Sequence, residues 1–228
     1  MTSLEASRNP DLNRRALAIE FSVVLTVAWL PMFIWGSMTR GEPQNRTIAS
    51  ELYGMLIYGG IIGLLLFLLW RNRESWRHVG LRRFRWWSEI LWAFLIYVAC
   101  WTSWIILGTW GRILFGDAPE SRAPADHPGT LYLVLLPLFL MVSAFFEELL
   151  VRGYLWNRLL RFTGNRWAAL LGSALLFTAY HPYPLGELVY IFTFGVVIGL
   201  FNWKARSLPR LILAHTLFNL SITYINLP

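Results

Sequence analysis

The chain has 228 residues, of which 56% are hydrophobic and 14% are charged, whereas a soluble domain carries about 25% charged residues. This composition excludes a soluble globular protein and indicates an integral membrane protein. The net charge of +7 indicates no nucleic-acid partner, because the arginines fall in short blocks between long apolar runs, as in the loops that flank membrane helices.

Seven apolar runs follow one another along the chain. Spanning the hydrocarbon takes about 20 apolar residues, and four runs of suitable length cover residues 21–39, 52–70, 90–111 and 128–146. Three shorter runs cover residues 167–180, 188–203 and 211–227. By length alone these three could be buried or re-entrant helices, but no segment between them is polar enough to form a soluble domain. We therefore predict a single all-α, polytopic membrane domain over residues 1–228, with about seven transmembrane helices.

The basic residues agree with seven spans and give them an orientation. With seven spans, 16 of the 20 Lys and Arg residues fall in segments on the side of the N-terminus, and four fall on the opposite side. Basic residues are enriched in cytoplasmic loops. We therefore expect a cytoplasmic N-terminus and an external C-terminus, in the plasma membrane of a prokaryote.

Ionisable residues in the apolar runs are the candidates for function, because a charge in hydrocarbon is expensive. Glu20, Glu89 and Glu187 lie at the ends of their runs, where a carboxylate can reach the interface, and we interpret them as structural. The other candidates form three short patterns. These are Glu147-Glu148-x-x-x-Arg152 after the fourth run, Phe177-x-x-x-His181 at the end of the fifth, and His215-x-x-x-Asn219 in the seventh.

The spacing within the patterns predicts which side chains share a helix face. Residues four apart lie on the same face, so Glu148 can pair with Arg152, and His215 can present its side chain together with Asn219. The ion pair could be only structural. Glu147 lies about 100° around the helix from Glu148, so the two carboxylates are expected to face different surroundings and not to share one proton.

Depths in the membrane predict whether the three patterns can meet. Measured from the expected cytoplasmic boundaries, Glu147 lies roughly 21 Å deep and His181 roughly 22 Å deep, at a rise of 1.5 Å per residue. Asn219 lies roughly 13 Å deep and His215 roughly 8 Å deep by the same rise. Helix tilt and side-chain reach can narrow this spread. We therefore expect an active-site cavity between the fourth, fifth and seventh helices.

The residue types in the patterns predict amide hydrolysis by activated water. The patterns contain no cysteine, aspartate or serine, so a nucleophilic triad is unsupported. A carboxylate in a low-dielectric pocket is a stronger base than one in water and can take a proton from a water molecule. A histidine beside it can orient that water, and a histidine with an asparagine can donate hydrogen bonds to the oxyanion. These parts require neither a metal nor a cofactor.

The three patterns, in this order on separate hydrophobic helices, resemble the motifs of the CAAX protease and bacteriocin-processing (CPBP) family. That family comprises the type II CAAX prenyl endopeptidases and their prokaryotic relatives, which are polytopic intramembrane glutamic proteases. The resemblance covers residues 131–228, whereas the first three helices resemble nothing specific. The resemblance implies that Glu147 is the catalytic glutamate and that Glu148 and Arg152 support it. It also implies that His181 shares the water and that His215 and Asn219 are the oxyanion donors.

Three functional classes stay open at this point. The first is an endopeptidase that cleaves a membrane-associated protein or peptide, which could be a lipidated CAAX-type substrate. The second is a zinc metalloprotease, although the chain has no His-Glu-x-x-His pattern. The third is a non-enzymatic membrane scaffold or a bacteriocin-immunity-type protein, because proteins similar to this family have been assigned such roles. The expected partners are the substrate and the lipid bilayer.

Overall fold

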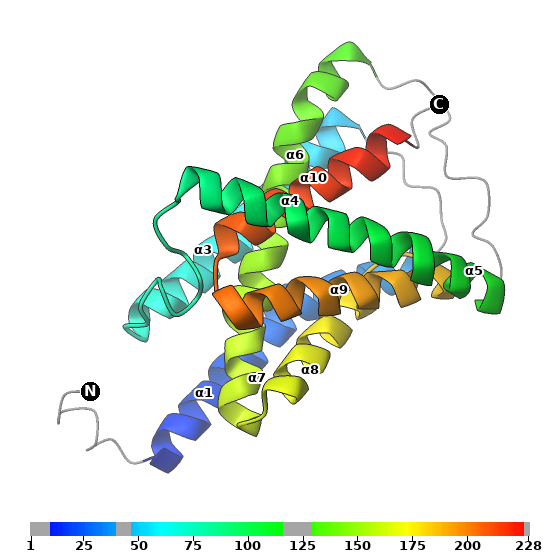
Figure 1. Ribbon diagram of the computed structural model, residues 1–228. Coiled ribbons are helices and arrows are strands. Elements are labelled where there is room, and N and C mark those ends of the chain that lie inside the picture. The colour runs from blue at the N-terminus through cyan, green and yellow to red at the C-terminus, as the bar shows by residue number, and fades with distance from the viewer. Residues whose placement is uncertain (1–9, 40–46, 116–128, 226–228) are drawn as a thin grey trace.

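The computed structural model describes residues 10–39, 47–115 and 129–225 (Figure 1). Within these ranges every regular element is a helix and there is no strand. The prediction of an all-α protein is therefore confirmed. Part of the outer loop expected between the third and fourth helices, and residues 1–9 with Arg8, lie outside the described residues.

The described chain forms seven helical rods in the order of the seven apolar runs. Three of the rods contain a π-helical turn, in which the helix widens by about one residue per turn. The first three rods are α1 (Pro10–Val24) with η1 (Leu25–Trp29) and α2 (Leu30–Met38), then α3 (Ile48–Arg71), then α4 (Trp86–Ser103) with η2 (Trp104–Gly108) and α5 (Thr109–Phe115). The last four are α6 (Thr130–Glu148) with η3 (Leu149–Leu155) and α7 (Trp156–Thr163), then α8 (Arg166–Ala179), α9 (Leu185–Ala205) and α10 (Leu208–Ile225).

A turn of two residues, Gly164 and Asn165, connects α7 to α8 and reverses the direction of the chain. Gly164 has a φ of 64°, a left-handed conformation that glycine adopts without strain and that commonly ends a helix. The next residue, Asn165, caps α8, since its side-chain oxygen accepts hydrogen bonds from the backbone amides of Trp167 and Ala168. This turn directs α8 back along the rod that carries the first sequence pattern.

Five helical segments of the described chain are long and apolar enough to cross a membrane: Arg15–Met38, Ile48–Arg71, Trp86–Phe115, Thr130–Thr163 and Leu185–Lys204. They confirm the prediction of a polytopic membrane protein. The helix α8 has 14 residues, which corresponds to about 21 Å, shorter than the roughly 30 Å of hydrocarbon. Full spans for α8 and α10 therefore stay predictions.

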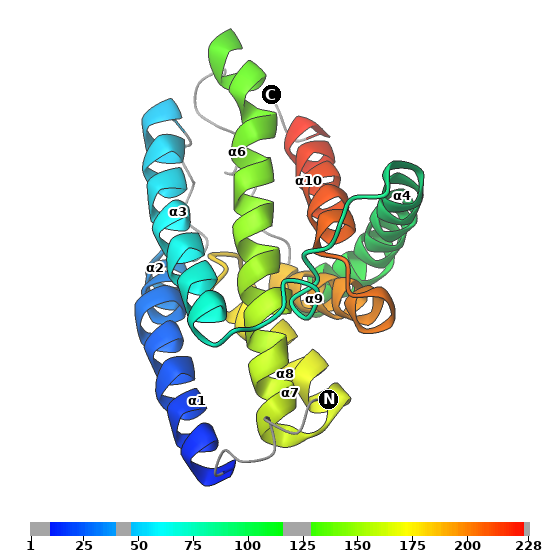
Figure 2. The same cartoon turned by 90° about the vertical axis from the view of Figure 1, so that its left-hand side faces the viewer.

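The fourth rod is the axis around which the other helices are arranged (Figures 1 and 2). Figure 2 shows α1 and α3 running alongside this rod, whereas α9 and α4 cross it at a steep angle. The helix α10 packs against both α4 and α6, and α8 packs between α7 and α9. Residues of the fourth rod are therefore in contact with elements from both ends of the chain.

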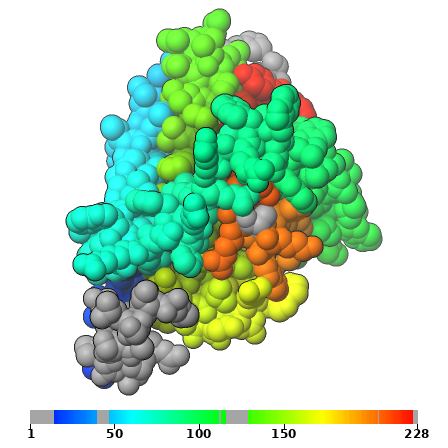
Figure 3. Space-filling view, turned by 60° about the vertical axis from the view of Figure 1, so that its left-hand side comes forward, coloured from blue at the N-terminus to red at the C-terminus, as the bar shows by residue number. Residues whose placement is uncertain are grey.

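Glu89, at the start of α4, is buried in an ion-pair cluster. Its side chain is fully buried and accepts hydrogen bonds from Arg210 Nε at 2.8 Å and Ser207 Oγ at 2.7 Å. The linker of residues 72–85 extends across this face of the molecule, as Figure 3 shows, and adds Arg82 at 3.3 Å. The structural role predicted for Glu89 thus consists in pairing with groups from distant segments, which compensate its burial.

Glu20 on α1 is buried in a second ion-pair cluster. Its Oε1 accepts hydrogen bonds from the Tyr154 hydroxyl at 2.8 Å and from Arg158 Nη2 at 2.8 Å, and Asn72 donates to the other carboxylate oxygen. Arg158 also pairs with Glu74 at 2.7 Å. The structural role predicted for Glu20 thus consists in joining the first rod to the fourth.

The first rod also packs against the end of α8. Trp29 Nε1 donates a hydrogen bond to the Leu176 carbonyl oxygen at 2.7 Å. Further along the rod, Gly36 lies so close to the α8 terminus that a Cβ built on it would be 1.9 Å from the carbonyl oxygen of Tyr180. Only a residue without a side chain fits there, because both the rod and the Tyr180 backbone would otherwise have to move.

Replacing Gly36 with alanine is expected to destabilise the protein. Overpacking of a tightly packed site costs about 1–3 kcal/mol, so Gly36→Ala should lower the midpoint of thermal unfolding measured in detergent micelles. Gly59→Ala on α3 is the matched control, because nothing lies within 4 Å of a Cβ built at Gly59. Equal unfolding midpoints for the two variants would contradict the close contact at Gly36.

Candidate active site

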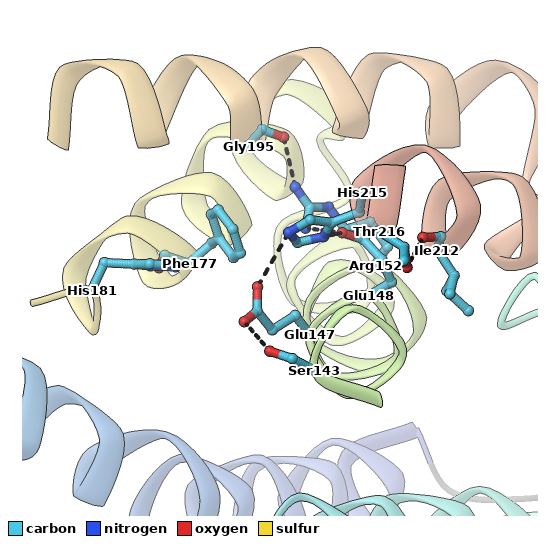
Figure 4. Close-up of polar contacts among 10 residues, drawn as sticks. All are labelled: Ser143, Glu147, Glu148, Arg152, Phe177, His181, Gly195, Ile212, His215 and Thr216. Carbon is cyan, nitrogen blue, oxygen red and sulfur yellow. Dashed lines mark hydrogen bonds and ion pairs between the residues drawn. The ribbon is translucent and has the colours of Figure 1, made fainter. Parts of the chain in front are cut away.

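The first and third sequence patterns meet where α10 crosses the junction of α6 and η3 (Figure 4). Glu147 and Glu148 are the last two residues of α6, and Arg152 lies in the π-helical turn that follows. Single π-helical turns inside α-helices are frequent at functional sites. The fourth rod therefore presents two carboxylates and a guanidinium where its hydrogen bonding changes from α-helical to π-helical.

Glu148 is the centre of a buried polar cluster. Its Oε1 accepts a hydrogen bond from Arg152 Nη1 at 3.0 Å and lies 2.8 Å from His215 Nδ1. The side chain of Glu148 is 0% exposed, so both contacts are made without competition from water. The pairing of Glu148 with Arg152 follows the four-residue spacing expected from the sequence.

Arg152 is held by three groups from different helices. Besides Glu148, its Nη2 donates to the carbonyl oxygen of Gly195 on α9 at 3.1 Å. Its guanidinium carbon lies 4.9 Å from the centre of the Phe177 ring on α8, a distance at which a cation is attracted to the ring face. The guanidinium is thus held by Glu148, by α9 and by α8.

Glu147 lies in different surroundings, as its place on the helix predicted. Its Oε1 accepts a hydrogen bond from Ser143 Oγ at 3.2 Å, and its Oε2 lies 3.6 Å from His215 Nε2. The side chain keeps 12% of its surface exposed. Of the two neighbouring carboxylates, Glu148 is neutralised by a guanidinium, whereas Glu147 faces only a hydroxyl and an imidazole. The cavity expected around it stays a prediction.

His215 joins the two carboxylates through its two ring nitrogens. An ionised carboxylate only accepts hydrogen bonds, so the contact with Glu148 places a proton on Nδ1 and directs Nε2 towards Glu147. The hydrogen bond between Nδ1 and Glu148 thereby fixes the orientation of the imidazole ring. The aromatic rings of Phe194 and Phe177, at centroid distances of 4.8 and 6.2 Å, pack against the imidazole.

His215 and Glu147 meet although residue counting along their helices separates them. Counted at 1.5 Å per residue, His215 lies roughly 13 Å nearer the expected cytoplasmic boundary than Glu147, whereas the two side chains are 3.6 Å apart. The inclination of α10 to α6 (Figure 2) contributes the tilt that the sequence analysis allowed for. The crossing brings the first half of α10 to the level of the α6 terminus.

His181 and His215 lie on opposite sides of the Phe177 ring (Figure 4). His181 follows α8, and its Nδ1 lies 2.7 Å from the carbonyl oxygen of Phe177. The Phe177 ring lies between the two histidines, at 4.6 Å from His181 and 6.2 Å from His215 (Figure 4). A role for His181 in binding the water therefore stays a prediction.

Asn219 lies on α10 one turn beyond His215 and is half-buried. No described residue forms a hydrogen bond with its side chain. Its amide donors are therefore available to a ligand, as an oxyanion donor would require. Its assignment to that role also stays a prediction.

Two residues of the cluster were not found by sequence reasoning. Ser143 precedes Glu147 by four positions, so helix spacing could have indicated it. Gly195 contributes only a backbone carbonyl from a distant helix, and no sequence signal points to it. Among the described residues, no group of three or more His, Cys, Asp or Glu side chains is arranged to hold a metal ion.

Comparison with protein families agrees with the resemblance found in the motifs. The family model described as Type II CAAX prenyl endopeptidase Rce1-like matches residues 129–221. This range contains all three patterns and the cluster built around Glu148. Neither the curated proteins nor the solved structures gave a match. The predicted family resemblance is thus confirmed for the C-terminal part of the chain.

Proposed function

Because residues 129–221 are an Rce1-like domain of the type II CAAX prenyl endopeptidase family, we propose that this protein is an intramembrane endopeptidase that uses Glu147 to activate water. The family match supports a membrane-embedded protease with a protein substrate. The finer proposal is that the substrate is a membrane-associated protein, with lipidated CAAX-type proteins as the candidate class. We also propose that the protein lies in the plasma membrane of a prokaryote, with its N-terminus in the cytoplasm.

The observation that carries this proposal is the unequal environment of the two glutamates. Glu148 forms an ion pair with Arg152 at 3.0 Å, which makes it a poor base. Glu147 lies next to it without a guanidinium, with Ser143 and His215 holding its two oxygens. A general base must be within reach of the proton that it takes and must not be occupied by a permanent cation.

The proposed reaction needs only water and the peptide bond. Glu147 takes one proton from water while the water oxygen bonds to the carbonyl carbon, and the π electrons of the carbonyl move onto its oxygen. When that oxygen returns its electron pair, the carbon–nitrogen bond breaks and the nitrogen receives the proton from Glu147. The products are a carboxylic acid and an amine. We propose that His215 orients Glu147 and, together with Asn219, donates to the oxyanion, and that His181 contributes to binding the water.

A zinc metalloprotease is the alternative that a simple experiment separates from this mechanism. Purified protein in proteoliposomes should cleave a membrane-anchored peptide at the same rate before and after dialysis against a chelator. Glutamate-activated water predicts no dependence on zinc. A rate that falls on dialysis and returns when zinc is added would assign Glu147 and His215 as ligands instead of base and orienting group.

A further inference from the structure

We propose that the hydroxyl of Tyr180 donates a hydrogen bond to the carbonyl oxygen of the scissile peptide bond. This role rests on the proposed function and adds a residue that no sequence pattern contains. The Tyr180 side chain is only 5% exposed. Its hydroxyl is buried, and no described residue is its hydrogen-bond partner.

An unpaired buried hydroxyl is unusual because it costs free energy. Buried side-chain polar atoms nearly always have a partner, and leaving one unsatisfied costs about 1–3 kcal/mol. A phenylalanine would fill the same space without that cost. A tyrosine in this position is therefore better explained by a partner that arrives with the substrate than by packing alone.

The position of Tyr180 places its ring against the aromatic groups that border the proposed site. The ring stacks on His181 at a centroid distance of 4.6 Å and meets Phe177 edge-on at 5.8 Å. Phe177 in turn packs against His215 at 6.2 Å, and His215 contacts Glu147. The close approach of Gly36 to the Tyr180 carbonyl fixes the backbone at this point, so the ring has little freedom to turn away.

The chemistry of the phenol suits an oxyanion. Tyr180 is a neutral donor, so it keeps its proton while the carbonyl oxygen of the substrate gains negative charge. A hydrogen bond to that oxygen strengthens as the charge develops, and this difference lowers the barrier. Tyr180 would act together with Asn219, since two donors are commonly directed at one oxyanion.

Tyr180→Phe tests the proposal, because it removes one oxygen and leaves the ring in place. For a lost oxyanion donor we expect kcat to fall by about 10²–10³-fold, with little change in KM. The midpoint of thermal unfolding should stay the same or rise, since the unpaired hydroxyl is gone. Opposite effects on activity and on stability are not expected of a residue that only supports the fold.

The matched control is Tyr190→Phe on α9, a tyrosine that is 6% exposed and that packs on Phe194 and Phe218 in the same core. Its kcat should not change. An unchanged kcat in Tyr180→Phe, or a fall in kcat together with a lower unfolding midpoint, would overturn the role of Tyr180. Glu147→Gln is measured in the same assay. Cleavage at the wild-type rate by that variant would overturn the proposed function, and this inference with it.

Discussion

Replacing Glu147 with glutamine is expected to remove the peptidase activity while the fold persists. The amide has the shape of the carboxylate but cannot take a proton from water, and a lost general base reduces the rate by about 10²–10⁴-fold. Ser143 can still hydrogen-bond to the amide oxygen, so the cluster should stay closed. The measurement is kcat for a membrane-anchored peptide in proteoliposomes, with the unfolding midpoint taken from the same preparation.

Glu51→Gln on α3 is the control for this substitution. Glu51 accepts a hydrogen bond from the Tyr132 hydroxyl at 3.4 Å and is not part of the cluster around Glu148. Replacing the Glu51 carboxylate by an amide should leave kcat unchanged. A wild-type rate in Glu147→Gln would mean that Glu147 is not the base, whereas equal losses in both variants would indicate a general sensitivity to lost carboxylates.

Replacing Glu148 with glutamine should damage the fold instead. The substitution leaves Arg152 buried without its carboxylate, and breaking a buried ion pair costs about 3–5 kcal/mol. It also removes the charged acceptor of His215 Nδ1, so the imidazole loses the contact that orients it. We expect a large fall in the unfolding midpoint and in the amount of protein recovered from membranes.

The double variant Glu148→Leu with Arg152→Met separates a lost ion pair from a lost shape. Replacing both charged partners by apolar residues of similar size is often neutral or stabilising, so the double variant should recover part of the lost stability. An unfolding midpoint for Glu148→Gln equal to that of the wild type would contradict the account. It would mean that Gly195 and Phe177 alone compensate the Arg152 charge.

The helical fold could be predicted from the sequence because apolar runs are a local signal. Each of the seven runs corresponds to one rod in the described chain. The run before Glu147 ends at Phe146, whereas the fourth rod continues to Thr163. An apolar run stops at the first charge, but a helix continues when its charges are paired inside the protein, as those of Glu148 and Arg152 are.

The site could be predicted only as far as single helices determine it. The pairing of Glu148 with Arg152 and the separate surroundings of Glu147 follow from helix geometry. The contact of His215 with both glutamates depends on the inclination of α10, which no local pattern encodes. The burial of Glu20 and Glu89 likewise depends on arginines more than 100 positions away in the chain.

The most direct test of the central claim compares the membrane proteomes of cells that carry the wild-type protein and cells that carry Glu147→Gln at the same level. Glutamate-dependent proteolysis predicts that at least one membrane protein accumulates uncut in the variant cells, and that its shortened form appears only with the wild type. Identical proteomes, together with an intact biological effect of the variant, would contradict a protease and support a membrane scaffold.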